Sequence, residues 1–171
     1  WIPFYLKTIN KGAPDPSLYS RERSEKFNTR VAEDMYIIES YRDTMMSRIL
    51  NTKLRKKKEY KYSDLGYYFM HQIIEKVSGV PLDQYVMENF YEPLDLRTMG
   101  YHPRGRIDMD DIVPTEYDVE FRRQQIHGDV HDPGTAMMGG VGGHAGVFSN
   151  AIDLAVFMQM LLNGGTYGGD D

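Results

Sequence analysis

The sequence predicts a mainly α-helical fold, and the spacing of its apolar residues carries that prediction. Apolar side chains recur every three or four positions in three stretches, 29–50, 65–79 and 150–162, as they do along the buried face of a helix. The chain has 171 residues, of which 41% are hydrophobic and 26% charged, as is typical of one globular domain. No apolar run approaches the roughly 18 residues that a membrane-spanning helix requires. We therefore expect a single domain, residues 1–171, without a membrane span.

Two helices are expected in the first fifty residues. Asp15-Pro16 favours a helix start, because proline at the first helical position has no N–H to leave unpaired. A long helix is expected from Thr29 to Leu50, and its apolar stripe is too short for a coiled coil, which favours core packing. That stripe consists of Val31, Met35, Ile38, Met45 and Ile49.

The next helix has the clearest start and stop signals in the chain. Ser63 or Asp64 can cap its start, because a short side-chain oxygen accepts hydrogen bonds from the first free backbone N–H groups. Gly79 supplies the left-handed residue that ends it. Its buried stripe is expected to contain Leu65, Phe69, Ile73 and Val77, with Tyr68 on the adjoining face.

Further helices are expected in the second half of the chain. One begins near Pro81 and ends before the next proline, which cannot continue it. Residues 99–138 are less regular, with one short helix expected near Tyr117 to Gln125. The last helix has Asn150 as its cap, with Asp153 three residues later. The side chains expected to face a core are Leu82, Tyr85, Val86 and Phe90 in the helix after Pro81, and Leu154, Phe157, Met158, Leu161 and Leu162 in the last helix.

Charge is distributed unevenly along the chain. Residues 1–62 carry 14 Lys and Arg against 8 Asp and Glu, a net +6, whereas residues 63–171 carry 6 against 17, a net −11, which gives the total of −5. The basic run between Lys53 and Lys61 would suit a nucleic-acid surface. Because the chain is acidic overall, a solvated loop is favoured and no nucleic-acid partner is expected. Cysteine is absent, which excludes disulfides and thiol chemistry.

Neither a metal nor a cofactor is expected. His127 and His131 have the spacing of two metal ligands on one helix face, and Asp132 follows them. Glycine and proline beside these residues argue against a helix there, and no third firm ligand is evident. The glycine run at 140–145 superficially fits a dinucleotide fingerprint, but no strand pattern precedes it, so we expect the glycines to give backbone flexibility.

Two motifs resemble those of a known enzyme family. Tyr62-Ser63-Asp64-Leu65-Gly66-Tyr67 opens the helix that ends at Gly79, and Gly143-His144-Ala145-Gly146 precedes the last helix. In order and spacing they resemble the serine β-lactamase and penicillin-binding-protein-like family, in particular its class C β-lactamase-related branch. The resemblance implies an internal, mainly helical piece of that family's α+β fold, with the flanking sheet parts missing. The chain starts at Trp1 and closes in a glycine-rich stretch, so we expect both ends to be cuts within a longer polypeptide.

The resemblance also implies roles for four residues. Tyr62 would be catalytic, shuttling a proton to and from a nucleophilic serine, with its pKa lowered by a nearby lysine. Asp64, also counted as catalytic, stands where the family usually has an asparagine that donates to the substrate amide, and an ionised carboxylate cannot donate. Esterase chemistry, peptidase chemistry and an inactive relative therefore all stay open. His131 belongs to a loop expected near the cleft and His144 to a segment expected beside the active-site wall, so both are expected to bind substrate, although for His131 a buried, hydrogen-bonded histidine is the alternative.

The catalytic set is incomplete in this sequence. No serine is followed three residues later by lysine, and neither Lys-Thr-Gly nor His-Thr-Gly occurs. We therefore expect a fragment of a serine hydrolase whose complete form acts on a small-molecule or peptide amide or ester, of β-lactam or cell-wall type, while the fragment is inactive alone. The alternative is a non-catalytic helical module that binds a ligand or packs against another hydrolase domain, such as a glycoside hydrolase. By resemblance, the parent protein is expected to be bacterial and either periplasmic or secreted.

Overall fold

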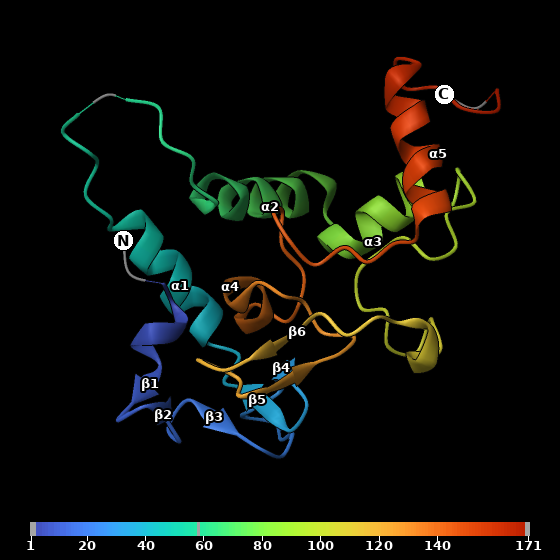
Figure 1. The fold of residues 1–171 in the computed structure, drawn as a ribbon. Coiled ribbons are helices and arrows are strands. Elements are labelled where there is room, and N and C mark those ends of the chain that lie inside the picture. The colour runs from blue at the N-terminus through green and yellow to red at the C-terminus, as the bar shows by residue number, and fades with distance from the viewer. Residues whose placement is uncertain (1–2, 58, 170–171) are drawn as a thin grey trace.

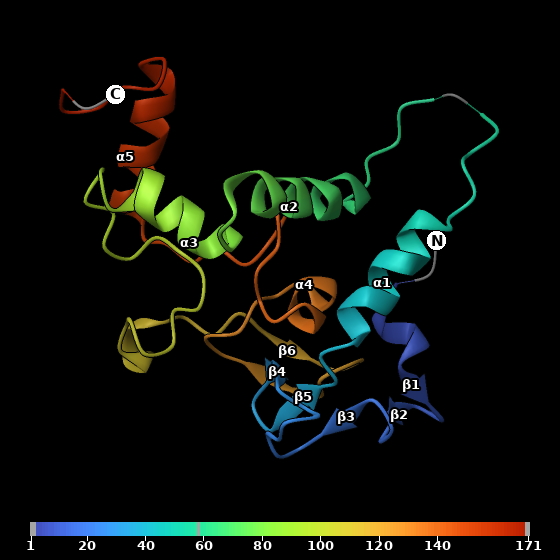
Figure 2. The ribbon, with the colours of Figure 1, turned by 180° about the vertical axis from the view of Figure 1, so that it is seen from behind.

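The computed structural model describes residues 3–57 and 59–169 and has a mixed α+β architecture (Figure 1). Small sheets and α1 (Tyr41–Leu50) lie at one end, and α4 (Pro133–Met137) lies between the sheets and α2 (Leu65–Ser78). The helix α5 (Ala151–Leu162) stands at the opposite end, as the view from behind also shows (Figure 2). The expectation of a mainly α-helical chain is correct for these helices, but it omits the sheets.

The described residues form three small antiparallel sheets. Strands β1 and β2 form a two-stranded ribbon, β3, β5 and β4 form a three-stranded sheet in that order, and β6 pairs with β7. Their bounds are β1 Ile9–Asn10, β2 Ala13–Pro14, β3 Tyr19–Ser20, β4 Thr29–Ala32, β5 Met35–Ile37, β6 Glu116–Asp118 and β7 Gln124–Ile126. Each strand is short, so the sheets depend on the helices and loops packed against them.

The long helix expected from Thr29 to Leu50 is wrong in its first half. That half forms the β4–β5 hairpin, and a helix, α1, begins only at Tyr41. Asp34 in the hairpin turn has φ 46°, a left-handed conformation that a right-handed helix cannot contain. Val31 and Met35 of the expected stripe instead lie on β4 and β5 and are buried there, whereas Met45 and Ile49 are buried on α1.

The helix start expected at Asp15-Pro16 is also wrong. The Asp15 carboxylate accepts hydrogen bonds from both the backbone N–H and the hydroxyl of Ser17, at 2.8 and 2.7 Å. These bonds form a local turn, which is the other common use of aspartate at such positions. A similar correction applies to the helix expected at Tyr117 to Gln125, where β6 and β7 form a hairpin and Arg123 has φ 54°.

Helix α2 has the predicted bounds but a different buried face. Gly79 ends it with φ 78°, as expected, and Ser63 Oγ accepts from the backbone N–H of Leu65 at 3.3 Å. The buried side chains are Tyr68 and His71, whereas the expected core residues Ile73 and Val77 are 52% and 83% exposed. The periodicity therefore located the helix correctly but not the face that packs inward.

The helix after Pro81 and α5 also lie where the sequence predicts them, but not all of the side chains that were expected to be buried are buried. Helix α3 (Leu82–Val86) continues as a π-helical turn, η2 (Met87–Tyr91), and buries Leu82 and Tyr91 while Phe90 is exposed. Asn150 caps α5 by accepting from the Asp153 backbone N–H at 2.8 Å, as predicted. The expected core residues Leu154, Met158, Leu161 and Leu162 of α5 are nevertheless exposed. Short 3-10 turns complete the described elements, η1 at Tyr5–Lys7 and η3 at Met109–Asp111.

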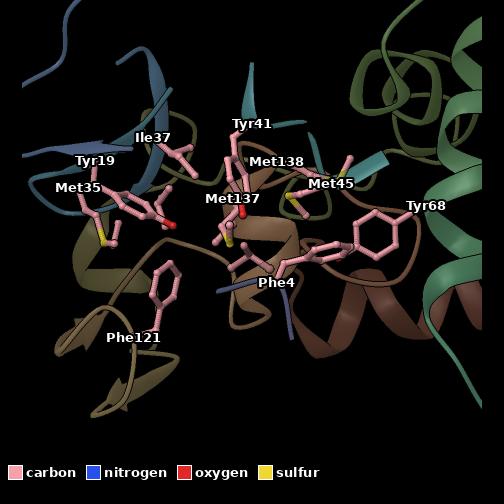
Figure 3. Packing of buried hydrophobic residues seen from close by; sticks show 14 of the residues in the cluster. Phe4, Tyr19, Met35, Ile37, Tyr41, Met45, Tyr68, Phe121, Met137 and Met138 are labelled. Carbon is pink, nitrogen blue, oxygen red and sulfur yellow. The ribbon is translucent and has the colours of Figure 1, made fainter. Parts of the chain in front are cut away.

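The main hydrophobic core joins the sheets to α1, α2 and α4 (Figure 3). The rings of Phe4 and Tyr68 meet edge to face, with centroids 5.8 Å apart, and so connect the N-terminal segment to α2. Phe121 packs against Tyr19 at 5.9 Å and joins the β6–β7 hairpin to the three-stranded sheet. Among the described residues, no helix is long and apolar enough to cross a membrane.

A buried arginine holds the β6–β7 hairpin against the loop that precedes α4. The Arg122 side chain has no exposed area and donates to the carboxylates of Asp118 and Glu116, both at 2.8 Å. It also donates to the backbone carbonyls of Val130 and His131, at 2.6 and 2.7 Å. The buried guanidinium group thus donates to four oxygen atoms. These hydrogen bonds offset the free energy that it costs to bury the charge.

Replacing this cation should destabilise the fold strongly. Arg122→Ala leaves the buried carboxylate of Asp118, the partly exposed carboxylate of Glu116 and two carbonyls without their donor, and we expect it to lower the free energy of unfolding by about 3–5 kcal/mol. Urea denaturation followed by circular dichroism measures the change. Arg97→Ala is the control, because Arg97 pairs with Asp95 on the surface, where a salt bridge contributes about 0–1 kcal/mol. Equal effects of the two variants would contradict the structural role of Arg122.

Candidate active site

An open cavity of about 910 Å³ lies between the N-terminal segment, the basic loop after α1, the start of α2 and the start of α4. We call it the Tyr62 cavity. The residues that line it are Pro3, Phe4, Tyr5, Thr52, Lys53, Arg55, Lys57, Glu59, Lys61, Tyr62, Ser63, Asp64, Leu65, Tyr68, Asp132, Pro133, Gly134 and His144. It thus contains Tyr62, Asp64 and His144, three of the four residues that the sequence predicted for the site.

Tyr62 and Asp64 form a hydrogen-bonded pair at the cavity wall. The Tyr62 hydroxyl donates to Asp64 Oδ1 at 2.8 Å, and the phenol is 66% exposed. That hydrogen bond, together with the negative charge of Asp64, raises the pKa of Tyr62 above its ordinary value. The resemblance led us to expect that a nearby lysine lowers this pKa; no lysine among the described residues does so, and for the complete protein the expectation stays a prediction. In this pair the Tyr62 phenol keeps its proton, and the Asp64 carboxylate is the hydrogen-bond acceptor.

His144 is fixed at the cavity by the N-terminal end of α4. Its Nε2 lies 3.2 Å from Asp132 Oδ1 and 3.2 Å from Thr135 Oγ1, and only 6% of its side chain is exposed. The imidazole ring also packs against the ring of Tyr68, with centroids 4.8 Å apart. A carboxylate, a hydroxyl and an aromatic ring thus fix both the position and the plane of the imidazole.

Asp132 connects His144 to the helix start. Its Oδ1 accepts from the backbone N–H of Thr135 at 2.6 Å, so Asp132 is the N-cap of α4, with Pro133 at the first helical position. Burial pushes the pKa of Asp132 up, but the hydrogen bonds from His144 and Thr135 outweigh burial and lower it. Asp132 is consequently a carboxylate at neutral pH, and it can serve only as an acceptor.

The glycine-rich segment reaches this position because it passes very close to α2. A Cβ atom on Gly143 would lie 2.7 Å from the carbonyl oxygen of Tyr67, and one on Gly142 would lie 2.8 Å from Thr135 Oγ1. Real Cβ atoms do not approach a backbone atom so closely, so only glycine permits this path. The expectation that these glycines accompany a close approach to the wall of the site agrees with this geometry.

Two cavity residues were not predicted as site residues. Tyr68 was expected only as a core residue, yet it also lines the cavity, and burial raises its pKa strongly, with smaller contributions from Asp132 and Asp64. Asp132 was considered only as a metal ligand. Its signal in the sequence is the Asp-Pro pair, which is typical of a capped helix start.

His131 lies outside the Tyr62 cavity. Its side chain is 68% exposed and its Nε2 lies 3.2 Å from Glu116 Oε2, on the side of the β6–β7 hairpin. His127 Nε2 lies 2.6 Å from the carbonyl oxygen of Ile112. Within residues 3–57 and 59–169, no three His, Asp or Glu side chains are grouped so that they could hold a metal ion.

Gly143→Ala should displace His144 from its partners. The added methyl group forces the segment away from α2, and we expect a loss of about 1–3 kcal/mol in the free energy of unfolding, as in overpacked cores. Gly66→Ala in α2 is the matched control, because a Cβ there meets no atom within 4 Å and alanine favours a helix by up to about 1 kcal/mol. Thermal denaturation of both variants measures the difference, and a neutral Gly143→Ala would contradict the close approach.

Asp132 should make stability depend on acid pH. Because its pKa is lowered in the fold, the stabilisation is present at neutral pH and is lost as pH falls below about 4, through the native pKa. We expect Asp132→Asn to lower the free energy of unfolding by about 1–2 kcal/mol at pH 7, and by progressively less below pH 4. Urea denaturation at a series of pH values measures this, with Asp95→Asn, at an exposed pair, as the control. A loss of stability in Asp132→Asn that stays constant down to pH 2 would contradict the dependence of the fold on the ionised form of Asp132.

Comparisons with known proteins identify the family of this chain. The family described as Beta-lactamase matches residues 14–171. A protein of Escherichia coli (strain K12) named "Putative D-alanyl-D-alanine carboxypeptidase" is 43% identical over 119 residues, which cover 63% of this chain and 27% of that protein. A protein of the same name from Salmonella heidelberg (strain SL476) is 40% identical over 119 residues, or 63% of this chain and 28% of the relative. No solved structure was found to match.

The chain thus spans little more than a quarter of the length of these relatives. The matched region includes the tyrosine motif, the Asp132 loop and the glycine-rich segment, because it covers nearly the whole described chain. The chain belongs to the β-lactamase family.

Proposed function

We propose that this chain forms the tyrosine-bearing wall of the active site in a serine hydrolase that works through an acyl-enzyme. The observation that carries the proposal is the Tyr62 phenol, hydrogen-bonded to Asp64 at the wall of an open cavity, in a chain of the β-lactamase family. The substrate that we propose is a peptide ending in D-alanyl-D-alanine, which agrees with the name that the relatives carry. Because the sequence lacks Ser-x-x-Lys, the proposal places the nucleophilic serine in polypeptide outside these 171 residues.

In this proposal Tyr62 relays one proton in each half of the reaction. Its raised pKa favours the protonated phenol. As the serine attacks, Tyr62 gives its proton to the leaving amine and takes up the proton of the serine hydroxyl, so the phenol is protonated again once the acyl-enzyme has formed. In deacylation Tyr62 takes a proton from the attacking water and gives its own to the departing serine oxygen, which restores both hydroxyl groups.

The alternative is a non-catalytic module that binds a ligand or packs against another hydrolase domain, such as a glycoside hydrolase. Asp64 favours this alternative, because it stands in place of an asparagine and its carboxylate is occupied by Tyr62. In both cases we propose a periplasmic or secreted bacterial protein, and only the family resemblance supports this location.

Labelling with a fluorescent penicillin distinguishes the two functions. We expect the complete gene product that contains this sequence to be labelled at one site per chain and to release D-alanine from a peptide ending in D-alanyl-D-alanine. The 171-residue chain alone should not be labelled. An unlabelled and inactive gene product would favour the binding module, and stoichiometric labelling of the 171-residue chain would place the nucleophile inside it.

Tyr62→Phe in the complete gene product tests the proton-transfer role. Removing a general acid typically lowers a rate by about 10²–10⁴-fold, and we expect a loss of acylation rate in this range. Tyr60→Phe is the control, because Tyr60 is 93% exposed and does not line the cavity. A Tyr62→Phe variant that is acylated as fast as the wild type would remove Tyr62 from the mechanism.

A further inference from the structure

The basic loop, residues 53–61, faces the Tyr62 cavity with alternate side chains. The loop residues that line the cavity are spaced two apart, and they are Lys53, Arg55, Lys57, Glu59 and Lys61. Leu54, Lys56 and Tyr60, which lie between them, do not line it. Successive side chains of an extended chain point to opposite sides, so the loop presents one of its two faces to the cavity. That face carries four cations.

Three of these four cations have no carboxylate partner among the described residues. Lys57 pairs with Glu59 on the same face, whereas Lys53, Arg55 and Lys61 pair with no described acid, and all three are exposed. The described residues of the loop also make no hydrogen bond to described residues outside it, and the loop arches away from the two helices that it joins (Figure 1). The three side chains can therefore turn toward a ligand in the cavity.

The carboxylates on the other side of the cavity already have partners. Asp64, at the start of α2, accepts from Tyr62, and Asp132, at the start of α4, accepts from His144 and from a backbone N–H. Their negative charges repel an anion there, whereas the unpaired cations attract one to the loop. The cavity thus has a negative side and a positive side. It suits a ligand that carries an N–H group close to a free carboxylate.

We propose that Lys53, Arg55 and Lys61 form a subsite that binds the free C-terminal carboxylate of the peptide substrate. The inference rests on the proposed function and names the group of the peptide that the loop recognises. In a peptide that ends in D-alanine, one carbon atom separates this carboxylate from the nitrogen that Tyr62 protonates in the proposed mechanism. A single cavity can therefore hold both groups, and a peptide that continues beyond this residue lacks the anion.

The three cations contribute in different ways. The guanidinium group of Arg55 can bind a carboxylate through two parallel N–H groups. A lysine ammonium is a flexible, strongly hydrated point charge, so Lys53 and Lys61 act mainly through their charge. We therefore expect Arg55 to contribute most to the subsite.

Arg55 and Lys56 are a matched pair for testing this subsite in the complete gene product. They are neighbours with the same charge, and only Arg55 lines the cavity. Arg55→Gln removes a charge from the subsite, and Lys56→Gln removes one beside it. The triple variant Lys53→Gln, Arg55→Gln, Lys61→Gln removes the whole subsite. Because the loop makes no hydrogen bond to the described remainder of the chain, all of these variants should melt at the wild-type temperature.

The ligands are N-acetyl-D-alanyl-D-alanine and its C-terminal amide, which differ only in the carboxylate. Their dissociation constants are measured at ionic strengths of about 0.01 and 0.15 M, where the Debye length is about 30 and 8 Å. We expect the wild type to bind the acid about tenfold more tightly than the amide at low salt, as for one charge-assisted interaction. Arg55→Gln should reduce this preference to about threefold and the triple variant should abolish it, whereas Lys56→Gln should keep it. Higher salt should weaken the binding of the acid alone.

Labelling with a fluorescent penicillin, measured in parallel, separates this inference from the proposed function. If the wild type binds acid and amide equally, or if Arg55→Gln and Lys56→Gln lose the preference equally, the loop holds no carboxylate subsite, and the proposed function stands as long as the protein is labelled. If the preference for the acid depends on Arg55 but the protein is never labelled, the inference stands and the acyl-enzyme proposal is wrong. A protein that binds neither ligand and is not labelled contradicts both.

Discussion

The geometry of the candidate site depends on the carboxylate of Asp132. This one side chain caps α4, accepts the hydrogen bond that orients His144, and lies at the wall of the Tyr62 cavity. It can do so because Arg122 holds the carbonyls of the two preceding residues, Val130 and His131, against the β6–β7 hairpin. Arg122 in the hairpin therefore determines the position of Asp132, some ten residues later in the chain. Asp132 in turn determines the position of the His144 imidazole, which comes from a third segment.

The second constraint is the absence of side chains at Gly142 and Gly143. Gly143 lies against the Tyr67 carbonyl of α2 and Gly142 lies against Thr135 of α4, each closer than a Cβ would allow, and this places His144 against the ring of Tyr68. This packing fixes the glycine-rich segment in place without a hydrogen bond, because the segment can approach no further unless the backbone of a helix moves. The site is thus rigid where the histidine lies. It is more open at Tyr62, whose phenol is mostly exposed and is held by Asp64 alone among the hydrogen bonds of the described residues.

The sequence predicted what depends on local chemistry and missed what depends on distant partners. Gly79 and Asn150 mark helix ends through their own conformations and hydrogen bonds, so the bounds of α2 and α5 could be predicted. Residues 29–37 have apolar spacing compatible with helix or strand, and only pairing with β3 and the turn at Asp34 decides in favour of strands. The pairing of His144 with Asp132 could not be predicted, because no local pattern joins them. The motif resemblance nevertheless placed His144 in the site, while His131, next to Asp132 in the sequence, lies outside it.

By resemblance an asparagine is expected at position 64, and the aspartate found there differs from it by more than the loss of one donor. An asparagine can both donate and accept, whereas an ionised aspartate only accepts, and here it accepts from Tyr62. Asp132 is held in its ionised form by His144 and Thr135. Asp64 and Asp132 therefore present acceptors to a cavity that is also lined by four cations, Lys53, Arg55, Lys57 and Lys61. Under the proposed function, a peptide substrate can meet both kinds of group in this cavity, with its backbone N–H groups at the carboxylates and its carbonyl groups at the cations.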